Sequence, residues 1–133
     1  MTTPMVRFTL ATSAFLLCLG SAQAANSRLP AGFMKMEPKT RSLQICNYKG
    51  SREIAKEKEY SRLDRVVVDA MSSPTFDRNV ISGDGGAFRV RGQWHRLQFK
   101  CVLADDNLSA TSFTYQVGDI IPEDEWERYG LWR

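Results

Sequence analysis

The fold is decided by the stretch Arg96-Leu97-Gln98-Phe99-Lys100-Cys101-Val102-Leu103. Its odd-numbered residues are all apolar, whereas most of its even-numbered residues are polar, and this period of two predicts a half-buried strand. A turn is expected at Asp105-Asp106-Asn107, and the segment 108–117 that follows places Phe113, Tyr115 and Val117 on one face. The two segments predict an antiparallel hairpin with one face in the core.

Further strands are predicted before this hairpin. The segment Arg65–Met71 is short and rich in β-branched residues, which is typical of a strand. A second segment lies near Thr75–Ile81, and Ser82–Gly86 is expected to form a tight turn before an alternating pattern resumes over Ala87–Arg91. The sequence therefore predicts an antiparallel sheet of about four strands.

Two short helices are predicted ahead of the sheet. Pro38 suits the first position of a helix, and Leu43 and Cys46 then fall on one face. Gly50 is expected to interrupt this helix, and Ser51 to cap a second one that runs through Lys58. Both helices are too short to be stable alone, so they must pack against the sheet.

A last short helix is expected after Pro122, with Trp126 on it, and the residues up to Trp132 are expected to fold back on the sheet. The predicted fold class is α+β, with two or three short helices packed on an antiparallel sheet of about four strands.

The first 24 residues have the features of a secretory signal peptide. Arg7 precedes the apolar run 14–19, and Ala22-Gln23-Ala24 offers small residues for cleavage after Ala24. We expect a flexible leader over 25–33, a single globular domain over 34–133, and a periplasmic or secreted location.

Cys18 raises the alternative of a lipoprotein, but the residues before it are bulky, whereas a lipid-attachment site requires small ones. Residues 25–133 contain no second apolar stretch long enough to span a bilayer, so no transmembrane segment is expected after removal of the signal.

Cys46 and Cys101 are the two cysteines that remain after cleavage. In an exported chain such a pair is most simply a disulfide, and we expect it to join the first helix to the strand of the central hairpin. Closing a loop of about 55 residues stabilises a domain by roughly 4 kcal/mol in the chain-entropy model. His95 is the only histidine, so no metal site and no cofactor are expected.

The charge distribution argues against nucleic acid as a partner. Residues 25–60 carry eight Lys and Arg against four Glu, and residues 61–133 carry nine against eleven acidic residues. Acidic residues are interleaved with the basic ones, whereas binding to a phosphate backbone requires an unmatched basic stripe. Weak attraction to anionic lipid headgroups or acidic envelope polymers remains the alternative.

Three features resemble catalytic or ligand-binding motifs, and each has a simpler interpretation. Ser82–Gly86 resembles a phosphate-binding loop, but a strand follows it where such loops precede a helix. His95 lacks a neighbouring nucleophile and is expected to be a packing residue. The acidic residues 123–125 and 127 suit the dipole of the helix after Pro122 better than a pair of glycosidase carboxyls. No catalytic residue is predicted.

Four residues form the candidate binding face: Arg89, Arg91, Trp94 and Arg96. An exposed tryptophan flanked by arginines is typical of binding hot spots and of platforms that stack sugars. In the alternative, which we favour, Gly92 marks a bulge that turns Trp94 into the core, because a small domain needs its large aromatic residues to fill its interior.

The ordered motifs of the chain resemble the domain of unknown function 930 family, whose members are small exported proteins of rhizobia, brucellae and related alphaproteobacteria. The resemblance covers nearly all of the chain after residue 33, and it implies an address in the cell envelope without supplying any catalytic residue. It rests on Met36–Arg41 with Cys46, Asp64–Val67, Gly86–Cys101 with its Trp94, Leu97 and Phe99, and Ser112–Pro122 with Trp126 and Tyr129.

These observations predict a small exported, non-enzymatic envelope protein that binds a periplasmic protein or glycan. The alternative is a secreted effector or inhibitor that acts on a host protein such as a lysozyme. A hydrolase ranks last, because no residue set in the sequence supports one.

Overall fold

The computed structural model describes residues 30–133. The predicted signal peptide, its cleavage site and Cys18 lie outside the described residues. Within residues 30–133, the last part of the predicted leader forms a helical turn, α1 (Ala31–Met34), whose Phe33 packs against the main apolar core.

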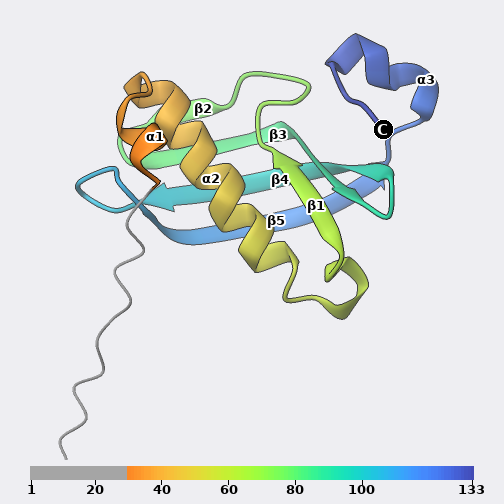
Figure 1. Ribbon diagram of the computed structural model, residues 1–133, viewed down its shortest axis with the longest axis horizontal. Coiled ribbons are helices and arrows are strands. Elements are labelled where there is room, and N and C mark those ends of the chain that lie inside the picture. The colour runs from red at the N-terminus through yellow and green to blue at the C-terminus, as the bar shows by residue number, and fades with distance from the viewer. Residues whose placement is uncertain (1–29) are drawn as a thin grey trace, which may run out of the picture.

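The predicted α+β fold is confirmed. One antiparallel sheet has the strand order β1-β3-β4-β5, with the short β2 paired to β3, and α2 crosses one of its faces (Figure 1). The short strand β2 brings the sheet to five strands, where about four were expected. The strands are β1 (Leu63–Val67), β2 (Thr75–Asp77), β3 (Val80–Val90), β4 (Gln93–Leu103) and β5 (Ala110–Ile120), and the helices after α1 are α2 (Pro38–Ile54), α3 (Glu123–Trp126) and the 3-10 turns Lys58–Tyr60 and Glu127–Tyr129.

A single helix, α2, replaces the two that were predicted on either side of Gly50. Pro38 starts it, and the Glu37 carboxylate caps it by accepting the backbone N–H groups of Lys39 and Thr40, each at 3.0 Å. Gly50 is buried, and a Cβ atom there would lie 2.8 Å from the Phe113 ring. The glycine therefore allows the helix to approach β5, and this packing outweighs its poor helix propensity.

The disulfide between Cys46 and Cys101 is confirmed. It joins α2 to β4 with a Cα–Cα distance of 5.9 Å, and both cysteines are fully buried. It lies within the core between α2 and the sheet, which also contains Phe88, Leu97 and Phe99.

The prediction of a tight turn at Ser82–Gly86 was wrong, because these residues lie inside β3. The register of β3 against β4 shifts between Gly83 and Gly86, which marks a bulge. A Cβ atom at Gly85 would lie 1.9 Å from the Ser72 hydroxyl oxygen, so the glycine is needed for the close approach of the 68–73 segment. The turn lies earlier, at Arg78-Asn79, where Asp77 pairs with Val80.

The prediction of a bulge at Gly92 was also wrong. Arg91 and Gly92 both have positive φ angles, 52° and 75°, and they join Val90 to its partner Gln93. Two successive positive φ angles are the signature of a two-residue hairpin turn, which matches the twist of the strands it connects. This turn fixes which face of β4 each side chain occupies.

A second apolar cluster lies on the sheet face opposite α2. It contains Ala87, Trp94, Ile121, Trp126 and Leu131, and the strand residues among them alternate with the residues of the main core. Figure 1 shows α3 and the C-terminus at the end of the sheet remote from α1. The C-terminal segment thus folds back on the sheet, as predicted, and covers only this end of the face.

Candidate binding cleft beside the edge strand

The structure divides the predicted binding face. Trp94 and Arg89 are opposite each other in register on β4 and β3, and both are buried, Trp94 completely. Arg96 is half-buried and donates to the Glu125 carboxylate at 3.2 Å, and Arg91 is exposed in the hairpin turn. These four residues do not form one exposed surface.

Arg89 and Trp94 instead hold the C-terminal residues in place. The Trp94 indole N–H donates to the Trp132 carbonyl at 2.8 Å, and the Arg89 guanidinium donates to the same oxygen at 3.1 Å. The guanidinium also lies over both indole rings, 5.5 Å from that of Trp94 and 5.8 Å from that of Trp132. Two donors on one carbonyl fix the position of Trp132.

Arg89 also positions Asp64 on β1. Its Nε and Nη2 atoms donate to the two carboxylate oxygens of Asp64 at 3.0 and 2.6 Å, which is a bidentate pair. The hydrogen bonds from Arg89 hold the pKa of Asp64 below its ordinary value, and the same pair raises the pKa of Arg89. Asp64 therefore stays ionised, with its charge largely compensated.

Asp64 and Trp132 both line a cleft of about 380 Å³ beside β1, an edge strand of the sheet. A volume of this size is at the lower end of the range for small-ligand sites. The cleft is walled by α2 on one side and by β1 with the C-terminal segment on the other, and its lining residues are Phe33, Gln44, Asn47, Tyr48, Ser51, Asp64, Arg65, Val66, Val67, Asp69 and Trp132.

Two aromatic side chains line this cleft and are still widely exposed. Tyr48 on α2 is 54% exposed, and Trp132 is 46% exposed. Large aromatic side chains on a surface are costly to leave in water and are enriched where a protein binds a partner. Their position in one cleft makes it the best candidate for a binding site.

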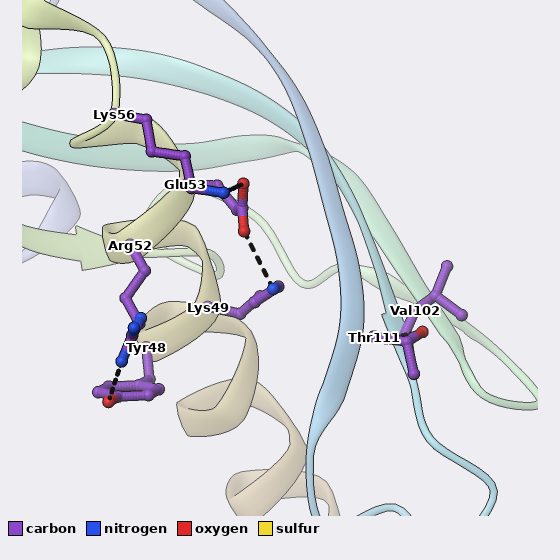
Figure 2. Close-up of polar contacts among 7 residues, drawn as sticks. All are labelled: Tyr48, Lys49, Arg52, Glu53, Lys56, Val102 and Thr111. Atoms are coloured by element: carbon purple, nitrogen blue, oxygen red, sulfur yellow. Dashed lines mark hydrogen bonds and ion pairs between the residues drawn. The ribbon is translucent and has the colours of Figure 1, made fainter. Parts of the chain in front are cut away.

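The α2 wall is braced by contacts along the helix surface. Figure 2 shows Arg52 against Tyr48, and Glu53 held between Lys49 and Lys56. Arg52 donates to the Tyr48 hydroxyl at 3.0 Å, and its guanidinium carbon lies 5.7 Å from the ring centroid. Tyr48 is thus oriented by its own helix.

Asn47, which lines the cleft, joins the helix α2 to the chain that follows β1. The side-chain oxygen of Asn47 accepts the backbone N–H of Val68 at 2.8 Å, just beyond the end of β1. This bond ties α2 to the edge of the sheet and satisfies a backbone donor there.

Arg65 stands at the cleft beside Trp132. Its guanidinium carbon lies 5.5 Å from the centroid of the Trp132 ring, and the residue is exposed. Within residues 30–133, Arg65 forms no ion pair. The cleft therefore presents a cation next to an aromatic face.

The remaining sequence candidates lie elsewhere. His95 is half-buried and stacks on Phe88 with 5.0 Å between ring centroids, and burial lowers the pKa of its imidazole. Glu123 and Glu125 pair with Arg133 and Arg96 around α3. Across the described part of the chain, the side chains of His, Cys, Asp and Glu form no group of three that could hold a metal ion.

The sequence patterns did not predict that Tyr48, Asp64 and Arg65 line one cleft. Tyr48 and Asp64 are far apart in the chain and meet only because α2 crosses toward β1. The available signal was an aromatic residue on the polar side of an amphipathic helix, which is too common to single out a site.

The fold and the cleft define a small α+β domain that is stapled by a disulfide and carries a lateral cleft. The model of the family described as Domain of Unknown Function (DUF930) matches residues 33–131, and the chain belongs to this family. This confirms the resemblance seen in the sequence motifs. No curated protein and no solved structure matches the chain.

Within residues 30–133, no helix combines the length and the apolar character needed to cross a membrane.

Proposed function

We propose that the protein is an exported, non-enzymatic binding domain that takes a glycan or protein partner in the cell envelope through the cleft beside β1. The observation that carries this proposal is the pair of exposed aromatic rings, Tyr48 and Trp132, lining one cleft together with polar side chains. Such a cleft offers apolar faces for contact area and polar groups for orientation.

The cleft favours a glycan over an extended peptide. A sugar ring has apolar C–H faces that stack on aromatic rings and hydroxyl groups that pair with carboxylate, amide and guanidinium groups, all of which line this cleft. A peptide would have to add a strand to the edge of β1. That edge is protected by an irregular register between Leu63 and Arg65, by exposed charges, and by the Asn47 contact to Val68.

The residues that the sequence offered as catalytic candidates make their contacts away from the cleft, and this supports a binding role without catalysis. His95 is half-buried and stacks on Phe88, and the acidic residues Glu123 and Glu125 are paired with arginines outside the cleft. None of these three residues lines the cleft.

The proposal is tested by measuring the binding of neutral and acidic oligosaccharides by calorimetry to the oxidised protein and to Trp132→Ala and Tyr48→Ala. We expect each substitution to weaken binding by about tenfold or more, since an aromatic anchor contributes at least 1 to 2 kcal/mol. Ile120→Ala is the matched control, because Ile120 is 50% exposed and lies outside the cleft. Unchanged affinity in folded Trp132→Ala and Tyr48→Ala would contradict the proposal.

A further inference from the structure

The charges of the cleft are unequally compensated. Asp64 is held by the bidentate contact with Arg89, so its charge is largely neutralised. Asp69 is exposed at the cleft, and Arg65 is exposed there without an ion pair among residues 30–133. A ligand in the cleft therefore meets one cation, Arg65, beside the aromatic wall and one anion, Asp69, and neither forms an ion pair among residues 30–133.

The position of Arg65 suits the recognition of a carboxylate. A guanidinium that stacks on an aromatic ring keeps its N–H groups in its own plane, pointing away from the ring face, where they can donate to a ligand. The guanidinium carbon of Arg65 lies 5.5 Å from the centroid of the Trp132 ring, which is within the range of such a contact. Stacking also restricts the arginine side chain before binding, which lowers the entropic cost of forming a fork with a carboxylate.

Arg52 adds a second positive group next to Tyr48, although it does not itself line the cleft. It lies over Tyr48 and donates to the hydroxyl of that residue, and it has no ion pair among the described residues. Each of the two exposed aromatic residues of the cleft, Tyr48 and Trp132, thus has an arginine against its ring. Asp69 remains as an acceptor for a hydroxyl group.

We infer that the ligand of this cleft is an acidic saccharide, with a sugar ring against Trp132 and Tyr48 and its carboxylate on Arg65. The inference rests on the proposed function and adds the chemical class of the glycan. The carboxylate is bound by the planar fork of Arg65, and Asp69 accepts a hydroxyl group of the ligand.

The test compares three probes by calorimetry at low salt: trigalacturonate, its methyl ester, and the neutral sugar chitotriose. For the unmodified protein we expect trigalacturonate to bind about tenfold more tightly than the ester, because a charge-assisted hydrogen bond is about twice as strong as a neutral one. Arg65→Gln should bring the two affinities together. Arg62→Gln removes a neighbouring exposed arginine that does not line the cleft, and it should leave the preference unchanged.

The outcomes separate this inference from the proposed function. Equal affinities for the acid and the ester, or a preference that survives in Arg65→Gln, overturn the acidic class, while binding that depends on Trp132 would still uphold a glycan site. If none of the three probes binds to the folded protein, both the inference and the glycan site fail. If Arg62→Gln lost the preference for the acid as fully as Arg65→Gln, the preference would arise from general surface charge. This result would also overturn the inference.

Discussion

At the scale of single residues, Trp94 illustrates how a tryptophan among arginines can hold the wall of a proposed binding cleft without lining it. Its ring is buried in the second apolar cluster, and its N–H group holds the carbonyl of Trp132. Arg89 acts on the same carbonyl and on Asp64. The two residues are positioning residues for the cleft.

We expect Trp94→Ala to destabilise the protein by roughly 3 to 5 kcal/mol, because it removes a fully buried aromatic side chain and leaves a cavity. Trp94→Phe keeps an aromatic ring and removes the donor to Trp132, so it should cost less stability and still weaken binding in the cleft. Thermal and urea unfolding measure the first effect and calorimetry the second. A Trp94→Ala variant with unchanged stability would contradict the burial of this residue.

Asp64 gives a pH-dependent prediction. Arg89 lowers its pKa in the folded protein below the ordinary value of 3.8. The ionised carboxylate therefore stabilises the fold above that value, and the stabilisation is lost as the pH falls through the lower folded-state pKa. The melting temperatures of the unmodified protein and Asp64→Asn should differ near pH 7 and converge in strong acid. A difference that is constant over this range would show that the charge of Asp64 is not involved.

For single residues, the sequence predicted some positions and not others. The sequence placed Arg89 and Trp94 close together, and the core position of Trp94 was the favoured interpretation. The exposure of Trp132 could not be read from the chain, because it depends on how residues 121–133 fold against β3 and β4.

At the scale of elements, the alternation of residues 96–103 and 112–117 predicted β4 and β5 correctly, since a half-buried strand displays its period directly. The prediction was wrong at β3, where Gly83, Gly85 and Gly86 were interpreted as a turn. These glycines serve close approaches to the Ser72 region and to Leu97 and Phe99, which are contacts from distant parts of the chain. Local propensity favoured a turn, and tertiary packing overrode it.

The prediction that Gly50 interrupts the helix was wrong for the same reason. This glycine gives a third prediction. Gly50→Ala should destabilise the protein by about 1 to 3 kcal/mol, although alanine is the better helix former, because the new methyl group meets the Phe113 ring. Phe113→Leu in the same chain should recover part of the loss. A double-mutant cycle by urea unfolding measures this coupling. A stabilised Gly50→Ala variant would show that α2 does not approach β5 this closely.

At the scale of the whole molecule, the disulfide joins the layer formed by α2 to the sheet. This was predictable, because only two cysteines remain once the expected signal peptide is removed, which leaves few alternatives. The cleft was not, because it forms where α2, β1 and the C-terminal segment meet, and no local pattern describes that meeting.

Replacing Cys46 and Cys101 by alanine should lower the melting temperature by many degrees, since closing this loop contributes roughly 4 kcal/mol and each kcal/mol shifts a domain of this size by several degrees. An unreduced digest of the native protein should contain the two cysteines in one linked peptide pair by mass spectrometry. Two free thiols in the native product would contradict the pairing.

The proposed export gives the last prediction. Intact-mass analysis of the native product should show a chain that begins at Ala25 and carries no lipid, because Ala22-Gln23-Ala24 suits the ordinary signal peptidase. Fractionation then separates a periplasmic binding protein, retained in the cell, from a secreted effector found in the medium. A mass that retains Cys18 with acyl chains would overturn the signal assignment.

Whether the cleft between α2 and β1 binds the proposed ligand is tested most directly by a titration of the isotope-labelled protein with trigalacturonate followed by NMR. We expect the shifts to concentrate on the indole N–H of Trp132 and the amides of Tyr48, Arg65 and Asp69. Shifts confined to the exposed strand residues Gln98, Lys100 and Thr114, with the Trp132 indole unmoved, would contradict the proposed binding site.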